Sequence, residues 1–148
     1  MIHKTAIINS NAKISSTVEI GPYAVIGPNV EIDDNVIIQS HVNITGHTKI
    51  GKNTFLDNQV HIAHNNKIGE NCIIAGQVGF AGSSTLGNNV MIGGQAGISG
   101  HLKVGNNVQI GGGSGVIKNI PDNSKVMGYP ARNLKKFIKD NQWYTKLQ

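Results

Sequence analysis

The chain has 148 residues, of which 39% are hydrophobic and 5% aromatic, and 19 of them are glycine. This length fits a single domain, and the scarcity of large rings favours a thin, repetitive β-structure over a compact α/β core. The net charge of +5 predicts an acidic partner, such as a phosphorylated small molecule or an acidic carrier protein. No basic stripe is interleaved with aromatic residues, which argues against nucleic acid.

Cysteine content and hydropathy indicate the compartment. Cys72 is the single cysteine, so the chain makes no internal disulfide. The N-terminus lacks the charged-then-apolar pattern of a signal peptide, and no apolar run approaches the roughly 20 residues of a membrane helix. We therefore expect a cytoplasmic protein without a membrane segment.

From the N-terminus onward, an aliphatic residue or phenylalanine occupies every sixth position, without interruption from Ile2 to Val116. Four residues after each of these, the side chain is usually small or β-branched, as at Val18, Ala24 and Cys72. In short strands of alternating character, both positions are predicted to point inward.

A longer period lies on top of these hexapeptide repeats, or hexads. The segment at 49–53 (Lys-Ile-Gly-Lys-Asn) returns in similar form after every third hexad, at 67–71, 85–89 and 103–107. Three hexads therefore close one coil, and stacked coils form a triangular prism of parallel strands. One corner of this prism is predicted to carry a ladder of residues that tolerate the positive φ of tight turns, namely Asn35, Asn53, Asn71, Asn89 and Asn107.

A single coil is not expected to be stable. Its three large inward residues contribute about 1.5–3 kcal/mol each, whereas ordering its backbone costs about 1–2 kcal/mol per residue. Stacked coils add strand hydrogen bonds, and a flat face buried against identical subunits adds more, so we expect an oligomer.

The hexads end near Val116, which divides the chain into a β-helix over 1–118 and a C-terminal part over 119–148. Turn-forming residues come first in the C-terminal part. Residues 133–147 then have the spacing of a short, basic, amphipathic helix.

Stacking at an interval of three hexads predicts which side chains lie above one another. One column contains Gly46, His64, Gly82, Gly100 and Lys118, and the next contains His47, Asn65, Ser83, His101 and Asn119. Histidine is the usual proton acceptor in acyl transfer, and glycine leaves its backbone N–H accessible. We expect His64 as general base and Gly82 N–H as oxyanion donor, about one strand spacing apart. Spacing alone leaves open that His64 is an ordinary surface residue of a turn.

The neighbouring residues are candidate binding groups. His61 contacts the acceptor sugar or, alternatively, makes a local hydrogen bond in a turn; His101 and His47 are candidates for contacts with phosphate, with the donor or with sugar. Asn65 and Ser83 are candidates for orienting the reactants. His61 and His64 supply two ligands at most, so no metal site is predicted. Cys72 occupies an inward position and is expected to pack in the core rather than act as a nucleophile.

The hexad run resembles the left-handed β-helix acyltransferases, and the left hand is implied by that resemblance. Residues 57–101, with Ile-Ala-His-Asn at 62–65 and Gly-Ser at 82–83, resemble the UDP-3-O-acylglucosamine N-acyltransferases of lipid A biosynthesis. The resemblance implies that His64 is the general base, that Gly82 supplies the oxyanion N–H, and that His101 lies along the phosphopantetheine path.

Two departures from that family affect the acceptor. The N-terminal domain that holds uridine is missing, and residues 2–53 instead resemble the sister UDP-N-acetylglucosamine O-acyltransferases. The second active-site histidine of that sister family is Ser83 here.

The sequence therefore predicts a homotrimeric acyltransferase with no permanently bound cofactor. The expected donor is an acyl-phosphopantetheine thioester of acyl carrier protein, and the expected acceptor is the amine of a UDP-linked glucosamine. Lys118, Arg132, Lys135 and Lys136 would attract phosphate or the acidic carrier. The alternatives are a sugar acetyltransferase that uses acetyl-coenzyme A, an O-acyltransferase acting on UDP-N-acetylglucosamine, and a non-catalytic β-helix scaffold.

Overall fold

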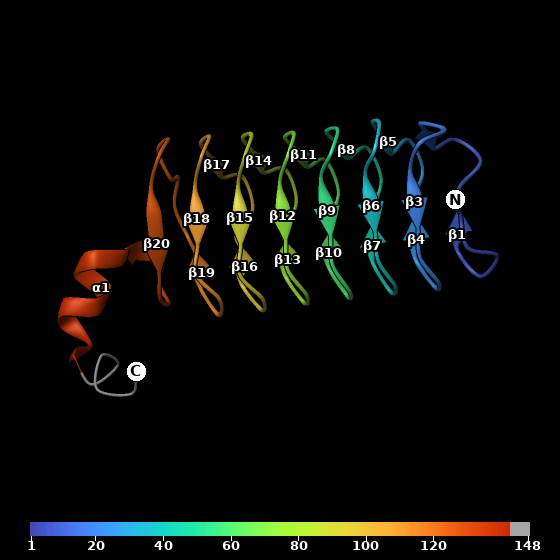
Figure 1. Ribbon diagram of the computed structural model, residues 1–148. Helices are drawn as coiled ribbons and strands as arrows, with labels where there is room; N and C mark the ends of the chain where they lie inside the picture. The colour runs from blue at the N-terminus through green and yellow to red at the C-terminus, as the bar shows by residue number, and fades with distance from the viewer. Residues whose placement is uncertain (143–148) are drawn as a thin grey trace.

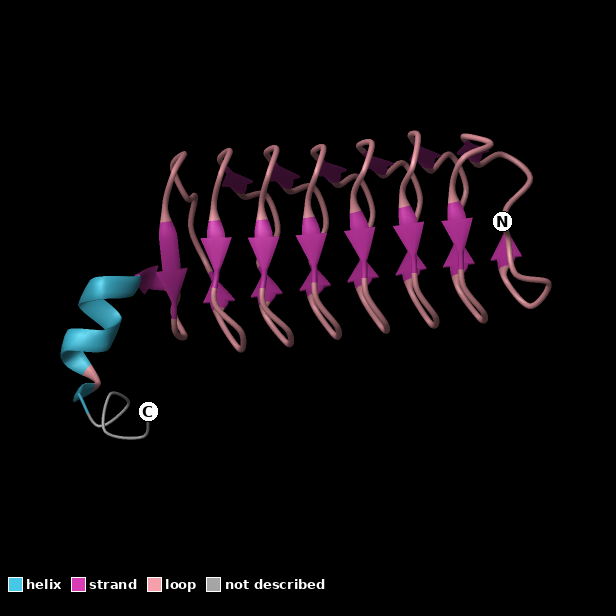
Figure 2. Ribbon diagram, viewed as in Figure 1, coloured by secondary structure: helices cyan, strands magenta, loops and turns pink. Residues whose placement is uncertain are grey.

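The computed structural model describes residues 1–142, which form a parallel β-helix closed at its C-terminal end by a short helix (Figure 1). The coils stack side by side in chain order, from the N-terminus to helix α1 (Leu134–Asp140). Apart from β20, each strand has two residues, and a turn follows each strand of the hexad run (Figure 2). This short pattern follows from the hexad, which leaves four residues for each corner.

The strands form three faces, which we call the first, second and third face. The first face contains β1 (Ile7–Ile8), β4 (Val25–Ile26), β7 (Asn43–Ile44), β10 (His61–Ile62), β13 (Gly79–Phe80), β16 (Gly97–Ile98) and β19 (Gly115–Val116). The second face contains β2 (Lys13–Ile14), β5 (Glu31–Ile32), β8 (Lys49–Ile50), β11 (Lys67–Ile68), β14 (Thr85–Leu86) and β17 (Lys103–Val104). The third face contains β3 (Glu19–Ile20), β6 (Ile37–Ile38), β9 (Phe55–Leu56), β12 (Ile73–Ile74), β15 (Met91–Ile92), β18 (Gln109–Ile110), β20 (Lys125–Met127) and β21 (Arg132–Asn133).

The predicted winding of three hexads per coil is confirmed by the strand register. Ile62 lies opposite Ile44 in the coil before it and opposite Phe80 in the coil after it. The inward hexad residues fill the prism, and Ile44, Ile50 and Ile62 have no exposed surface. Ile2 departs from this pattern at 48% exposure, because it belongs to the first coil and no further coil covers it.

Three corners join the faces, and we name each by its side chains. The His64 corner joins the first face to the second and contains turns 45–48, 63–66, 81–84 and 99–102. The Asn corner joins the second face to the third and contains turns 51–54, 69–72, 87–90 and 105–108. The Gln corner joins the third face to the first and contains turns 57–60, 75–78 and 93–96.

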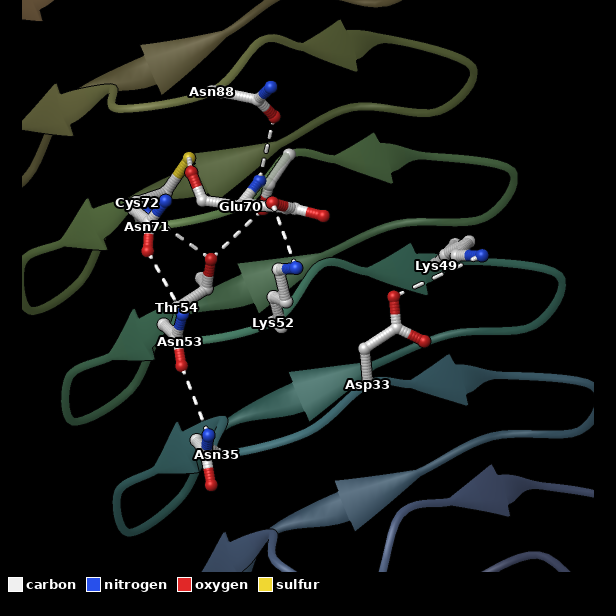
Figure 3. A network of polar contacts seen from close by, with 11 residues as sticks. Asp33, Asn35, Lys49, Lys52, Asn53, Thr54, Glu70, Asn71, Cys72 and Asn88 are labelled. Atoms are coloured by element: carbon white, nitrogen blue, oxygen red, sulfur yellow. Dashed lines mark hydrogen bonds and ion pairs between the residues drawn. The ribbon is translucent and has the colours of Figure 1, made fainter.

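The predicted asparagine ladder is present at the Asn corner (Figure 3). Asn35 Nδ2 donates to Asn53 Oδ1 at 3.2 Å, and Asn53 Nδ2 donates to Asn71 Oδ1 at 3.1 Å. Their φ angles are 57°, 57° and 55°, in the left-handed region that asparagine tolerates. Inside the same corner, Thr54 Oγ1 donates to the Gly69 carbonyl at 2.9 Å.

The last coil is shorter than the others. Val104 bridges to Ile120, and Gln109 pairs with Lys125, so the coil after Val116 falls short of three complete hexads. The expected column of His101 therefore ends one coil earlier than predicted. Asn119 lies beside Lys103 instead, and its Oδ1 accepts a hydrogen bond from Lys103 N at 2.8 Å.

The C-terminal helix is shorter than the predicted 133–147. Asn133 begins α1 as its N-cap, with Oδ1 accepting from Lys136 N, and Asn141 ends it. Phe137 is half-buried, as the predicted apolar side requires, whereas Ile138 is exposed. Residues 143–147 of the predicted helix lie outside the described residues. Within residues 1–142, no helix is long and apolar enough to cross a bilayer.

Candidate active site

The His64 corner brings together the candidate residues of the two predicted columns. Ser83 N donates to the His64 carbonyl at 2.9 Å, and His101 N donates to the Gly82 carbonyl at 3.1 Å. Asn65, Ser83 and His101 have φ angles of 57°, 64° and 60°, so each occupies the left-handed position of its turn. The stacking predicted from the sequence is therefore confirmed for these residues, whereas their chemical roles remain predictions.

The imidazole of His64 lies against the Cα of Gly82. A Cβ placed on Gly82 would be 2.5 Å from His64 Cε1 and 2.6 Å from Nε2, which is closer than real Cβ contacts. His64 is exposed, and Gly82 is half-buried. A glycine is therefore required at this level if the ring is to occupy this space.

A hydrogen bond fixes the orientation of the His64 ring. Its Nδ1 lies 3.0 Å from Asn65 Oδ1. An amide oxygen accepts but does not donate, so the proton of the neutral ring belongs on Nδ1, which donates to Asn65. This tautomer leaves the lone pair of Nε2 free to accept a proton.

The N–H of Gly82 donates no hydrogen bond to any described residue. Two equivalent amides of the Asn corner differ, because Glu70 N donates to Asn88 Oδ1 and Asn88 N donates to Asn106 Oδ1. At the His64 corner no side chain of residues 1–142 accepts from the Gly82 N–H, which leaves a donor beside the imidazole. Such a donor meets the geometric need of an oxyanion site.

The other candidate histidines are exposed and lie around this pair. His61 belongs to strand β10 of the first face, between Asn43 and Gly79 in the neighbouring coils. The alternative that it makes a local hydrogen bond in a turn is wrong, because it is a strand residue pointing outward. His47 and His101 are exposed turn residues of the same corner.

A groove of about 460 Å³ runs along the second face beside this corner. His47, Asn65, Lys49 and Lys67 are among its lining residues. Lys49 lies 4.0 Å from Asp33, whereas Lys67 forms no ion pair with any described residue. The volume of the groove is within the range of small-molecule binding sites.

Two cations predicted to attract phosphate lie outside the corner turns. Arg132 Nη1 forms an ion pair of 3.0 Å with Asp140, and its guanidinium carbon lies 5.7 Å from the centre of the Phe137 ring. Lys118 is exposed in the shortened coil that follows Val116.

Among residues 1–142, no group of three or more His, Cys, Asp or Glu residues is arranged to hold a metal ion. Cys72 is buried, and desolvation raises the pKa of its thiol. Its Sγ lies 3.2 Å from the Gly87 carbonyl, in agreement with a packing role.

Asn66 is a site residue that the column analysis missed. It is 1% exposed and bonds to both the turn of His64 and the turn of Gly82. The sequence did contain a signal, because the inward corner position that Asn66 occupies is apolar in most other coils.

The structure is similar to solved sugar-nucleotide acyltransferases. UDP-N-acetylglucosamine O-acyltransferase (LpxA) from Moraxella catarrhalis is 26% identical, with a TM-score of 0.62, over 94% of this chain and 77% of that chain. LpxA from Acinetobacter baumannii is 25% identical, with a TM-score of 0.58, over 95% of this chain and 77% of that one. GDP-perosamine N-acetyltransferase from Caulobacter crescentus, solved with CoA and GDP-perosamine, shares the fold at 18% identity and a TM-score of 0.50. The match covers 87% of this chain and 56% of that chain. No curated protein matches the chain in sequence.

The three parallel faces and the closing helix, together with these similarities, define a left-handed parallel β-helix. The hand implied by the sequence resemblance is thus confirmed. Residues 2–93 match the family described as the GMPPB C-terminal domain. That match covers more than half of the chain, and the chain belongs to this family. The resemblance of residues 57–101 to the N-acyltransferases remains a prediction.

Proposed function

We propose that this protein transfers an acyl group from a thioester to a nucleotide-linked sugar, with His64 as general base. This proposal depends mainly on two groups that have no hydrogen-bond partner among residues 1–142, namely Nε2 of His64 and the N–H of Gly82, the residue against which the ring lies. Acyl transfer needs both groups, one to accept a proton and one to stabilise an oxyanion. The similarity to the LpxA structures, which spans nearly the whole chain, supports the same class of reaction.

The reaction proceeds by attack of a sugar amine on the thioester carbonyl. The nitrogen forms a bond to the carbonyl carbon, and Nε2 of His64 takes the proton that the amine loses. The carbonyl oxygen becomes an oxyanion that accepts a hydrogen bond from Gly82 N–H. Collapse of this intermediate breaks the carbon–sulfur bond, and the imidazolium returns its proton to the departing thiolate.

The acceptor diphosphate is assigned to the groove of the second face. Its lysine Lys67 has no anionic partner among the described residues, and His47 and Lys49 add donors along the same wall. Asn65 lies both in this groove and on the His64 ring, which connects the two parts of the site. His61 and Ser83 are assigned to the sugar side.

The donor is assigned to a phosphopantetheine thioester, with acyl carrier protein favoured over coenzyme A. His101 lies one turn above Gly82, where a pantetheine arm or its phosphate would approach. Lys118, Lys135 and Lys136 are exposed cations that an acidic carrier would contact. Arg132 is a weaker candidate, because its Nη1 already pairs with Asp140.

A homotrimer is supported by the different character of the three faces. The outward residues of the third face include Ile37, Phe55, Ile73 and Met91, and the last two are 47% and 49% exposed. Those of the first face are Ile7, Val25, Asn43, His61 and three glycines, whereas those of the second face are largely charged. An apolar row like that of the third face is seldom left uncovered in a folded protein.

Packing the first face of one subunit against the third face of the next would place the Gln corner at the three-fold axis. The His64 corner then forms the outer edge of each contact, beside the Asn corner of the neighbouring subunit. The groove on the charged second face would stay open to solvent and substrate. This arrangement puts the reacting pair at a seam between two subunits.

Mass spectrometry of reaction products tests the function. The protein is incubated with UDP-glucosamine or UDP-N-acetylglucosamine, each with acyl-carrier-protein and coenzyme A thioesters. We expect acylation of the free amine from the carrier-protein donor. Acetylation from coenzyme A alone would contradict the carrier-protein donor and favour an acetyltransferase. Acylation of a hydroxyl would contradict the amine acceptor and favour an O-acyltransferase. Absence of product with every donor and acceptor would contradict the proposed acyltransferase activity and favour a non-catalytic scaffold.

A further inference from the structure

Both the nitrogen and the oxygen of the Asn66 side-chain amide form hydrogen bonds inside the His64 corner. Its Nδ2 donates to the Ala63 carbonyl at 2.7 Å and to the Ala81 carbonyl at 3.0 Å. Its Oδ1 accepts from Ser84 N at 3.0 Å. Asn66 is 1% exposed, so bulk solvent does not reach the amide, and loss of any one of these partners leaves a buried polar group unpaired.

The two carbonyls belong to the peptide groups of the reacting pair. Ala63 C=O shares its peptide plane with the N–H of His64, and Ala81 C=O shares its plane with the N–H of Gly82. In a trans peptide the carbonyl and the N–H point in opposite directions. A donor that holds the Ala81 oxygen inward therefore turns the Gly82 N–H outward, toward the surface where His64 lies.

Thr48 and Ser84 occupy the same inward column in the neighbouring coils, but the side chain of each donates to only one carbonyl. Thr48 Oγ1 donates to the Ala63 carbonyl at 3.0 Å, and Ser84 Oγ donates to the Ser99 carbonyl at 2.8 Å. Each hydroxyl therefore holds one carbonyl, in the coil above its own. Asn66 holds a carbonyl in its own coil and another in the coil above, which connects the turn of His64 to the turn of Gly82.

We infer that Asn66 is a positioning residue that aims the Gly82 N–H at the oxyanion and fixes its distance from the His64 ring. This inference rests on the proposed acyl transfer for its catalytic consequence, although the peptide orientation stands on the hydrogen bonds alone. A hydrogen bond donated to the Ala81 oxygen also polarises that peptide and strengthens its N–H as a donor.

Two substitutions of Asn66 distinguish its effect on the orientation of the Gly82 N–H from its contribution to core packing. Asn66→Val removes every side-chain hydrogen bond. Asn66→Thr should restore the bond to the Ala81 oxygen, as Thr48 makes the equivalent bond to Ala63. The matched control is Thr54→Val in the Asn corner, which removes a buried bond to the Gly69 carbonyl away from the site. Asn66→Leu serves if the valine variant does not fold, because Leu102 occupies the same inward column.

The kinetic readout is kcat against the KM for the acyl donor. We expect Asn66→Val to lower kcat about tenfold or more with the donor KM within about twofold, since one misaligned oxyanion donor costs on this order. Asn66→Thr should recover most of kcat, and Thr54→Val should retain it even where its unfolding midpoint falls. Unchanged kcat in Asn66→Val, or an equal fall in Thr54→Val, would overturn the inference.

A spectroscopic readout keeps the test valid if no acyl transfer is found. In the wild-type protein, the His64 Cε1 proton should show a nuclear Overhauser effect to a Gly82 Cα proton. That effect and the Gly82 amide chemical shift should change in Asn66→Val and return in Asn66→Thr. Such a result without enzymatic activity would reject the proposed function but keep the positioning role, whereas an unchanged Gly82 amide would reject the positioning role itself.

Discussion

Gly82 has no side chain because the imidazole of His64 occupies the space that one would need. A Cβ there would lie 2.5 Å from the Cε1 atom of the ring. Gly97 gives a contrasting case on the first face, where an added Cβ would have no neighbour within 4 Å. Glycine at position 82 therefore reflects a close approach between two coils rather than the conformational demand of a turn.

We expect Gly82→Ala to displace the His64 ring, because a side chain yields more readily than backbone. The variant keeps the peptide N–H and should fold with a free energy of unfolding within about 1 kcal/mol of wild type. Its kcat should fall by about 10²-fold, in the range typical of a mispositioned general base.

Steady-state kinetics and urea unfolding of Gly82→Ala and Lys103→Ala check this expectation together. Lys103→Ala removes an exposed side chain of the second face and should keep wild-type activity and stability. Equal activities in the two variants would mean that the His64 ring does not need this space.

The positions of His64, Gly82 and Asn65 beside one another could be predicted from spacing, because a strict register of three hexads per coil fixes which residues are neighbours. The contribution of Asn66 could not be predicted in this way. An inward asparagine looks like a polar interruption of the core until its two carbonyl partners in different coils are known. Nor could spacing reveal the Arg132–Asp140 ion pair, which depends on how the chain folds back after the last coil.

Among the structural elements, the Asn corner has the closest backbone packing between successive coils. Gly51, Gly69, Gly87 and Gly105 occupy the same position in consecutive turns. A Cβ on Gly69 would meet the Gly87 carbonyl group, with its carbon 2.5 Å away. Because the obstacle is backbone hydrogen-bonded into the next coil, the coils would have to separate to admit a methyl group.

We therefore expect Gly69→Ala to lower the free energy of unfolding by about 1–3 kcal/mol, the usual cost of overpacking. Urea denaturation monitored by circular dichroism measures this loss. Lys103→Ala is the control, because its side chain is exposed on the second face. A Gly69→Ala variant as stable as Lys103→Ala would contradict the close stacking at this corner.

The strands and corners could be predicted almost completely from the sequence, whereas the structure that follows the last hexad could not. Hexads specify inward and outward positions directly, so strand β10 and its neighbours were predictable. The shortened last coil and the antiparallel pairing of β20 with β21 arise where the hexads have ended. The helix was expected over 133–147 but ends at Asp140, since no periodic signal marks its last turn.

At the scale of the whole molecule, the proposed seam between subunits requires a trimer that buries the first and third faces. Light scattering should give a mass near three times the chain mass of 15.7 kDa. Ile73→Lys places a charge in the centre of the proposed contact and should shift the protein toward monomer with loss of activity. Lys103→Glu on the second face should leave the mass unchanged. A wild-type monomer that is fully active would contradict the seam between subunits.

The central claim is that the His64 imidazole accepts the proton during acyl transfer, and His64→Ala tests it most directly. The measurement is kcat/KM for transfer from the donor and acceptor identified by mass spectrometry, alongside the thermal unfolding midpoint. The ring is exposed, so the midpoint should stay within a few degrees of wild type. We predict that kcat/KM falls by about 10²–10⁴-fold. A folded His64→Ala protein with near-wild-type kcat/KM would contradict the account.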